Sequence, residues 1–301
     1  MRVLVTADTV GGVWTYTREL VTGLTRQGHE VVLVSLGGMP TDEQASWING
    51  LPRLAFYPTA YKLEWMQDSA NDLKASQTFL SRLIAKSRPD LLHFSQYCYG
   101  ALECDIPKVV VAHSDVVSWQ VAVHGEEPGP EPWIEQYREV VMKGLAGADA
   151  VVGVTSWMLR QIETHYAGPV LKKVIYNGRN PRLFSPDSSK QHYAVSVGRL
   201  WDPAKQVNLL LEIDAPPPIR IAGGERHPES GASSAAKARK RGVEFLGVQS
   251  EEALRELYSR ASIYIATSRY EPFGLAAVEA ALSGCAILAN DIESLREVWG
   301  D

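Results

Sequence analysis

The sequence predicts an α/β protein made of two domains, each a parallel sheet covered by helices on both faces. Short apolar, β-branched runs alternate with longer segments of helical spacing along almost the whole chain. A stretch dense in turn residues, 179–191, interrupts this alternation. A length of 301 residues suits two domains of ordinary size. We therefore predict doubly wound domains at residues 1–178 and 192–301, joined by a linker at 179–191.

The elements of the first domain follow from short apolar runs and from helical spacing between them. The looser stretch 37–61 contains several Gly and Pro residues, so we predict no regular element there. Strands are expected at 2–7, 30–35, 90–94, 108–112, 150–155 and 173–176, and helices at 13–27, 65–86, 132–145 and 157–166.

The second domain repeats the pattern. Strands are expected at 193–198, 219–222, 243–246, 261–268 and 286–289, and helices at 203–212, 251–260, 275–283 and 293–298. Open parallel sheets bind ligands at the carboxyl ends of their strands. The loops that follow the strands of both domains are therefore where we look for a site.

Composition narrows the function classes. A net charge of −5 and a pI near 5.9 argue against nucleic acid as a partner. Cys98, Cys104 and Cys285 lack metal-site spacing and fit a reducing compartment, and neither a signal peptide nor a membrane-spanning run is apparent. We therefore expect a cytoplasmic protein.

Tryptophans are frequent in the first half of the chain. Packing in the core is the simpler interpretation, and the alternative is a surface that faces sugars or lipids. That alternative leaves open a peripheral contact with the inner membrane. The tryptophans concerned are Trp47, Trp65, Trp119, Trp133 and Trp157.

The most informative motif lies at residues 269–280, between a predicted strand and a predicted helix. Glu271 precedes the helix and Glu279 follows it by two turns, with seven residues between them. The amides near Phe273, Gly274 and Leu275 would open the helix, and a helix start suits a phosphate. Carboxylates on both sides could bind the sugar parts of a nucleotide sugar.

Two polar turns follow strands of the first domain. Gly11-Gly12 could let a ligand approach the backbone, although the turn lacks a full G-x-G-x-x-G pattern and is equally well explained as structural. His113 precedes Ser114 and Asp115, and could face a ligand or belong to a capped turn. Both alternatives stay open at both turns.

Arg199 and Lys205 lie six residues apart after the first strand of the second domain. Both could neutralise a diphosphate, and the alternative is two solvated surface charges. The sequence shows neither an Asp-x-Asp pair nor a zinc-type cluster, so we expect chemistry without a metal.

Taken together, these residues resemble the retaining glycosyltransferases of family 4, which have the GT-B fold. The resemblance covers nearly the whole chain, and its most specific part is the Glu-x7-Glu motif. The other residues that carry it are Gly11-Gly12, Gly28 to Val31, His113, Asn177-Gly178, Gly198 to Leu200 with Lys205, and Phe245 to Gly247.

The resemblance implies two Rossmann-like domains that face each other across a cleft, and a role for each site residue. Arg199, Lys205 and the amides of residues 273–275 would hold the donor diphosphate, and Gly12 would let it approach the first helix. Glu271 would contact the donor sugar, and Glu279 the ribose. His113 would approach the sugar from the first domain.

The activity implied is metal-independent transfer of a hexose from a nucleotide sugar to an acceptor hydroxyl, with retention and without a further cofactor. The acceptor could be a carbohydrate, a lipid or a small molecule. Chains of this family usually continue beyond the helix at 293–298, so we expect the second domain to be truncated, with exposed apolar surface and scope for self-association. Alternatives are a catalytically weak nucleotide-sugar-binding module and a nucleotide-sugar epimerase.

Overall fold

A computed structural model of the chain describes residues 1–166, 171–187, 189–213, 217–226 and 241–300. Backbone contacts divide the chain into two compact units. Unit 1 comprises residues 1–121 and 126–177, and unit 2 comprises residues 122–125 and 178–301. The stretch 179–191, which we predicted as a linker, is therefore part of unit 2.

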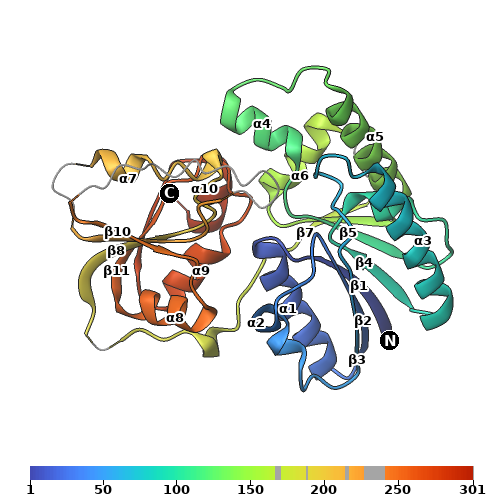
Figure 1. Cartoon of the computed structure of the whole chain (residues 1–301), viewed down its shortest axis with the longest axis horizontal. Coiled ribbons are helices and arrows are strands. Elements are labelled where there is room, and N and C mark those ends of the chain that lie inside the picture. Colours follow the sequence, from blue (N-terminus) through green and yellow to red (C-terminus); the bar gives the residue numbers. More distant parts are fainter. Residues whose placement is uncertain (167–170, 188, 214–216, 227–240, 301) are drawn as a thin grey trace. The chain divides into compact units, whose positions relative to one another are not determined.

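Unit 1 is built on a parallel sheet that has seven strands within the described residues, in the order β3-β2-β1-β4-β5-β6-β7 (Figure 1). The central strands are nearly continuous apolar runs, because both faces of such a sheet are buried. The strands are β1 (Arg2–Asp8), β2 (Glu30–Leu36), β3 (Leu54–Pro58), β4 (Leu91–Phe94), β5 (Lys108–Ala112), β6 (Ala150–Gly153) and β7 (Lys172–Val174).

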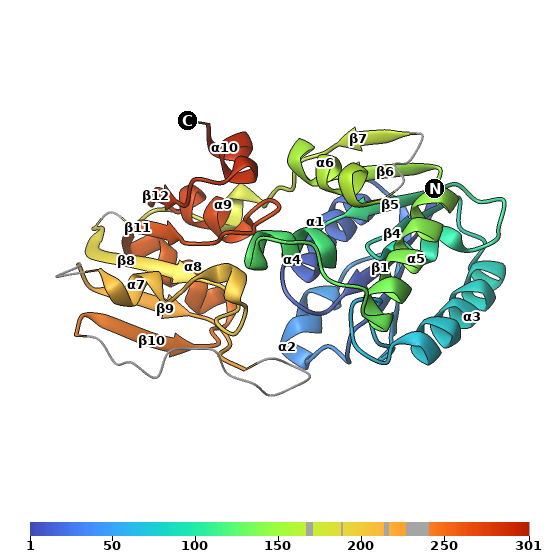
Figure 2. The ribbon, with the colours of Figure 1, turned by 90° about the horizontal axis from the view of Figure 1, so that it is seen from above.

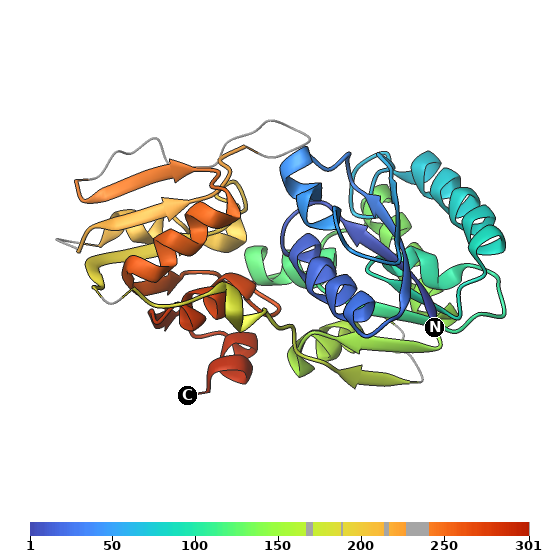
Figure 3. The same ribbon diagram turned by 90° about the horizontal axis from the view of Figure 1, so that it is seen from below.

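Helices cover both faces of this sheet, with α1 on one face and α3 and α5 on the other (Figures 1 and 3). On the α1 face, Trp14 and Val21 pack against Val5 and Leu33. The helices are α1 (Gly12–Arg26), α2 (Asp42–Ala45), α3 (Ala70–Ser87), α4 (Val116–His124), α5 (Pro132–Gly147) and α6 (Ser156–His165), with short 3₁₀ turns η1 (Ser46–Ile48) and η2 (Tyr97–Ala101).

Helix α5 packs unusually close to the turn η2. A Cβ atom added to Gly144 would lie 1.8 Å from the carbonyl oxygen of Tyr97, and one added to Gly100 would lie 2.1 Å from the carbonyl oxygen of Gly144. Only glycine at both positions permits this contact. The contact fixes α5 against the turn that follows β4.

The positions of the tryptophans favour the first interpretation, packing in the core, and not a surface that faces sugars or lipids. The ring of Trp47 lies edge-on to that of Trp14, with centroids 5.7 Å apart. Trp65, Trp119, Trp133 and Trp157 are likewise half-buried. Among the described helices, none combines the length and the apolar character needed to cross a bilayer.

Unit 2 has a second parallel sheet, with five strands in the described residues, in the order β10-β9-β8-β11-β12. Helices α8 and α9 cover one of its faces and α7 the other (Figures 1 and 2). The strands are β8 (Gln191–Val197), β9 (Ile219–Ala222), β10 (Val243–Gly247), β11 (Ala261–Ala266) and β12 (Ala286–Ala289). The helices are η3 (Pro181–Leu183), η4 (Pro203–Lys205), α7 (Leu209–Glu212), α8 (Glu251–Arg260), α9 (Leu275–Leu282) and α10 (Glu293–Trp299).

Side-chain alternation along β8 builds the two cores of unit 2. Tyr193 and Val195 pack with residues of α8 and α9, whereas Ala194 packs on the opposite face with Leu210 of α7. This is the period of two expected for an extended strand that is buried on both faces.

The helix predicted at 203–212 is wrong in one respect, because it is broken into η4 and α7. The Asp202 carboxylate accepts a hydrogen bond from the Ala204 amide at 3.0 Å and starts η4. Gln206 then adopts a left-handed conformation with φ of 46°, which ends the turn. Lys205 is thus the last residue of a short turn.

The stretch 37–61, predicted as irregular, contains α2, η1 and β3. Strand β3 lies at the edge of the sheet and is only half-buried, so its residues lack the strong apolar signal of a central strand. In unit 2, Leu288 of β12, a strand at the end of the described strand order, is 59% exposed.

Candidate functional site

In unit 2, the loop after β8 and the loop after β11 are tied together at the carboxyl edge of the sheet. The Thr267 hydroxyl donates to the Lys205 carbonyl oxygen at 2.6 Å. The Arg269 amide donates to the Ala204 carbonyl oxygen at 2.9 Å. These bonds place the cations predicted after β8 beside the Glu-x7-Glu motif that follows β11.

The loops after β8 and β9 also meet at this edge. Gly223 has φ of +147°, and a Cβ atom there would lie 1.7 Å from the Gly198 carbonyl oxygen. Only glycine fits at 223, because any side chain would displace the end of β8. The backbones of the two loops are therefore in close contact at this edge.

Lys205 and Glu271 form an ion pair at the centre of this edge. The Lys205 ammonium donates a short hydrogen bond to Oε2 of Glu271, and the two side chains are only 16% and 22% exposed. The Ser294 hydroxyl donates to the Glu271 carbonyl oxygen at 2.7 Å, which fixes this residue from α10. The structure thus brings together two residues predicted separately from the sequence.

Arg199 belongs to the same loop as Lys205 and is more exposed, at 43% of its side chain. One guanidinium nitrogen donates to Asp202 at 2.9 Å, and the guanidinium lies 5.3 Å from the centre of the Trp201 ring. Asp202 and Trp201 orient the guanidinium while leaving part of it open to solvent. A phosphate could reach the exposed part.

Helix α9 begins at the turn within the motif. Gly274 is the N-cap residue with φ of 89°, and no side chain caps the first turn. Phe273 is buried and anchors the turn, and a Cβ atom on Gly274 would lie 3.4 Å from Cγ of Glu271. The start of α9 thus has no side-chain cap and lies next to Glu271, a position that favours an anion.

Glu279 belongs to a buried network that the sequence did not reveal. Its Oε1 lies 2.8 Å from Nε of Arg179, whose side chain is 1% exposed. The same guanidinium donates to Glu251 at 2.9 Å and lies 5.2 Å from the centre of the Phe184 ring. Sequence reasoning missed Arg179 because it stands in the turn-rich stretch taken as a linker, where nothing local signals burial.

In unit 1, Gly11 and Gly12 form the turn between β1 and α1. Gly11 is the N-cap residue with φ of 83°, and no side chain caps α1. The Asp8 carboxylate accepts a hydrogen bond from the Val10 amide at 2.6 Å, which tightens the turn. The positive φ explains Gly11 structurally, and the helix start carries no side-chain cap, so both interpretations of the turn stand.

His113 follows β5 directly and is held by an aromatic neighbour. The ring of Tyr16 lies edge-on to its imidazole, with centroids 4.6 Å apart. Its Nε2 is buried and has no hydrogen-bond partner among the described residues. Burial, together with nearby His93, lowers the pKa of His113 to about 3, so the imidazole is neutral near pH 7.

Asp115, two residues later, has the capping role that was one of the alternatives at this turn. Its Oδ1 accepts hydrogen bonds from the Ser118 amide and from the Tyr166 hydroxyl, each at 3.0 Å. The acid is therefore committed to the start of α4. The His113 ring takes no part in these hydrogen bonds.

His93 and Tyr16 complete this cluster and were missed in the sequence. Nε2 of His93 lies 3.0 Å from the Tyr16 hydroxyl oxygen. Burial lowers the pKa of His93 to about 4. The available signal was a histidine within the apolar run of β4. Within the described residues, no group of three or more His, Cys, Asp or Glu side chains could hold a metal ion.

Comparisons with known proteins place these features in context. A family model described as Glycosyltransferase Family 4 matches residues 10–183, and one described as Glycosyl transferases group 1 matches residues 183–301. An uncharacterized glycosyltransferase of Methanocaldococcus jannaschii is 25% identical over 96% of this chain and 79% of its own length. An alpha-maltose-1-phosphate synthase of Mycolicibacterium smegmatis is 25% identical over 69% of this chain, and the match spans 58% of that relative.

Solved structures share the architecture. Sucrose-phosphate synthase from Thermosynechococcus elongatus superimposes with a TM-score of 0.78 at 19% identity, over 98% of this chain and 82% of that one. Anabaena HepE in complex with UDP-glucose superimposes with a TM-score of 0.71 at 15% identity, over 99% and 82% of the two chains. At such identities the likeness establishes the fold.

Proposed function

This chain belongs to glycosyltransferase family 4, and on that premise we propose that it transfers a hexose from a nucleotide sugar to an acceptor hydroxyl with retention of anomeric configuration. The observation that carries the proposal is the Lys205–Glu271 pair beside the uncapped start of α9. A cation, a carboxylate and a helix start without a side-chain cap, at one strand edge, match a diphosphate joined to a sugar.

The leaving group is the part of the donor that unit 2 would stabilise. Negative charge develops on the diphosphate as its bond to the anomeric carbon breaks, and Lys205, Arg199 and the amides of residues 273–275 would neutralise it. Lys205 is paired with Glu271 in this structure, so a bound phosphate would share the ammonium with that carboxylate. This sharing would turn Glu271 toward the hydroxyls of the sugar.

The transfer step would proceed on one face of the sugar. The acceptor oxygen forms a bond to the anomeric carbon as the bond to the phosphate oxygen breaks, and the acceptor proton passes to the departing phosphate. We assign no protein nucleophile. His113, as a neutral imidazole, would contact a sugar hydroxyl without adding charge, and Glu279 would bind the ribose from its ion pair with Arg179.

UDP-glucose is the first donor to test. The solved complex of Anabaena HepE contains UDP-glucose, and the lipopolysaccharide outer core enzyme WaaB is described as a galactosyltransferase. Hexose donors thus recur among proteins that share this fold. Lys205, Arg199 and the α9 amides would neutralise the diphosphate without a divalent metal.

Calorimetric titration of the full chain with UDP-, GDP- and ADP-glucose, in the presence of EDTA, tests the proposal. We expect saturable binding of one nucleotide class, which then supports hexose transfer to an added acceptor. Nuclear magnetic resonance of the product should show the anomeric configuration of the donor. Absence of binding by all three, an inverted product, or an isomerised donor without transfer would contradict the proposal.

A further inference from the structure

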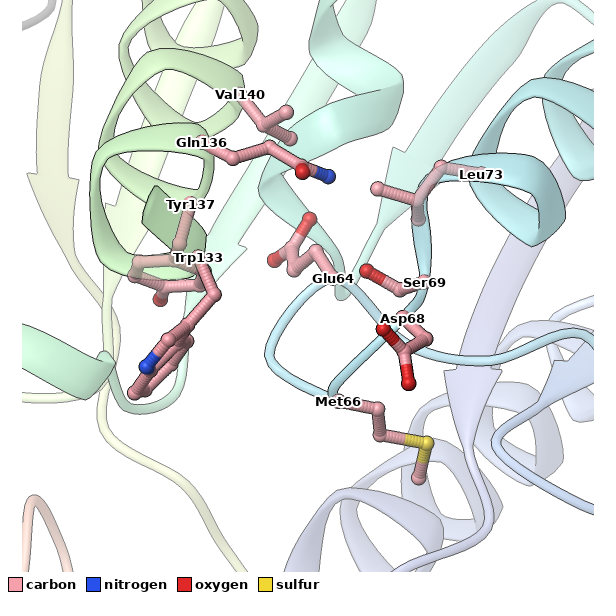
Figure 4. A pocket seen from close by; sticks show the side chains of 9 residues that line it. All are labelled: Glu64, Met66, Asp68, Ser69, Leu73, Trp133, Gln136, Tyr137 and Val140. Carbon is pink, nitrogen blue, oxygen red and sulfur yellow. The ribbon is translucent and has the colours of Figure 1, made fainter. Parts of the chain in front are cut away.

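Glu64 in unit 1 and Glu279 in unit 2 are both mostly buried, but their carboxylates are held in different ways. Glu64 accepts hydrogen bonds from the amides of Tyr97 at 2.9 Å and Cys98 at 2.7 Å, and so caps the turn η2. The hollow beside it measures about 20 Å³, which is room for about one water molecule (Figure 4). These bonds give Glu64 a structural role.

Glu279 is held by a cation, the guanidinium of Arg179. Its Oε1 lies 2.8 Å from Nε of Arg179, and the side chains of Arg179 and Glu279 are 1% and 13% exposed. A carboxylate has several acceptor positions, so an ion pair at Oε1 leaves capacity for hydroxyl groups. A hydroxyl that donates to a carboxylate forms a charge-assisted bond, which is stronger than a neutral one. Glu279 can therefore accept from a ribose while it stays paired with Arg179.

The guanidinium of Arg179 is itself fixed by other elements of unit 2. One of its terminal nitrogens donates to Glu251 of α8 at 2.9 Å, and the group lies 5.2 Å from the centre of the Phe184 ring. A guanidinium is planar and presents its donors in a rigid fork. Fixing the fork on α8 and on the aromatic ring therefore also fixes the direction from which it meets the Glu279 carboxylate on α9.

The energetics of burial favour a role for Arg179 in positioning. A buried ion pair adds little net stability, because the lost hydration of both charges offsets their attraction. What the pair supplies is a defined place for a carboxylate that burial would otherwise disfavour. Arg179 compensates for the hydration that Glu279 loses and holds the carboxylate in one direction.

We propose that Arg179 is a positioning residue for the donor: it orients the Glu279 carboxylate toward the ribose hydroxyls, so that the site selects ribonucleotides over 2′-deoxyribonucleotides. The inference rests on the proposed function, because Glu279 has a ribose to bind only if the donor is a nucleotide sugar. The Arg179 side chain is almost completely buried, so it acts through Glu279 and not by touching the ligand.

Calorimetric titration of the full chain with UDP, GDP and ADP, each beside its 2′-deoxy form, tests this selectivity. The wild type should bind the ribo form of one base about 10- to 100-fold more tightly, the range for a hydrogen bond to a charged group. Arg179→Met removes the guanidinium and should reduce the preference to about threefold, as for a weaker, neutral-type hydrogen bond.

Further variants separate positioning from a general effect on folding. Arg179→Lys keeps the charge but loses the planar fork, so the ribose preference should fall while urea unfolding shows a stability closer to wild type than that of Arg179→Met. In a Glu279→Ala background, Arg179→Met should change the preference no further, because Arg179 acts through that carboxylate. Arg182→Met is the matched control, since Arg182 is an exposed arginine three residues later.

Kinetics give a second readout. The diphosphate separates the ribose from the anomeric carbon, so Arg179→Lys should raise the donor KM about tenfold and leave kcat within about twofold, as for loss of uniform binding. A wild-type ribose preference and donor KM in folded Arg179→Lys and Arg179→Met would refute the role of Arg179 while the transferase function stands.

Two results with the wild type would overturn more than the role of Arg179. Equal binding of the ribo and 2′-deoxy forms would refute the contact between Glu279 and the ribose, and this inference with it. Loss of all nucleotide and nucleotide-sugar binding would refute the proposed function itself.

Discussion

The two units differ in the charge state of the polar side chains near the carboxyl edges of their sheets. Unit 2 presents charged pairs, Lys205 with Glu271 and Arg179 with Glu279. Unit 1 presents His93 and His113, whose pKa values are lowered by burial so that both imidazoles are neutral near pH 7. Unit 2 is thus suited to an anionic ligand, and unit 1 to a neutral one.

This difference has a simple physical basis. A charged side chain tolerates partial burial when an opposite charge compensates for its lost hydration, as in the pairs of unit 2. A histidine without a carboxylate partner loses its proton instead. The charged pairs of unit 2 and the neutral histidines of unit 1 support the proposal that unit 2 binds the diphosphate and unit 1 contacts sugar hydroxyls.

The largest effect should come from removing the charges of unit 2. Lys205→Ala should lower kcat for transfer by about 10²- to 10³-fold, as for loss of one group that stabilises developing charge. Glu271→Gln should also lower kcat strongly, because a neutral amide is a weaker acceptor for the sugar hydroxyls than a carboxylate. Arg199→Ala should have a smaller effect that shrinks with added salt, because this side chain is more exposed. Steady-state kinetics measure both, with Arg255→Ala on α8 as the control. Wild-type rates in all three site variants would refute the assignment.

A smaller effect should appear in stability when the buried pair of unit 2 is broken. Glu279→Ala leaves the buried Arg179 guanidinium with fewer compensating charges, which should lower the free energy of unfolding by about 3 kcal/mol. Urea unfolding measures this change, and Glu252→Ala, an exposed residue of α8, is the control. Arg179→Met should restore part of the loss in the Glu279→Ala background. Equal stability of Glu279→Ala and wild type would show that the ion pair contributes nothing measurable.

The neutral imidazoles of unit 1 predict a dependence of stability on pH. In the unfolded chain a histidine binds a proton near pH 6.5, whereas folded His93 and His113 do so only near pH 4 and 3. The unfolded state therefore binds more protons between these values, and stability falls as the pH falls from 7 to 5, by about 2 kcal/mol per histidine.

Thermal unfolding between pH 5 and 7.5 measures this slope. His93→Gln and His113→Gln should each flatten it, and the comparison with wild type cancels the opposite contribution of Glu64, whose pKa is raised. Identical slopes in wild type and both variants would contradict the buried, neutral state of the cluster.

The GT-B fold predicted from the sequence is confirmed by the two parallel sheets and by the solved structures that share them. Short apolar strands and helical spacing are local signals, and they located every central strand. The errors lie where local signals are weak. Strand β3 is a half-buried edge strand, and the helix expected at 203–212 is broken at Gln206, whose left-handed conformation nothing nearby in the sequence requires.

Local sequence was enough to predict the alternation of strands and helices, the family motif at Glu271 to Glu279, and the glycine that opens α9. These features depend on neighbouring residues, whose spacing and conformational preferences are written locally. The folded chain was needed to see that Lys205 contacts Glu271, 66 residues away, and that Tyr16 contacts His93, 77 residues away. Folding also buried Arg179. Such contacts depend on which faces the packed sheets and helices present to each other, and no local pattern encodes that choice.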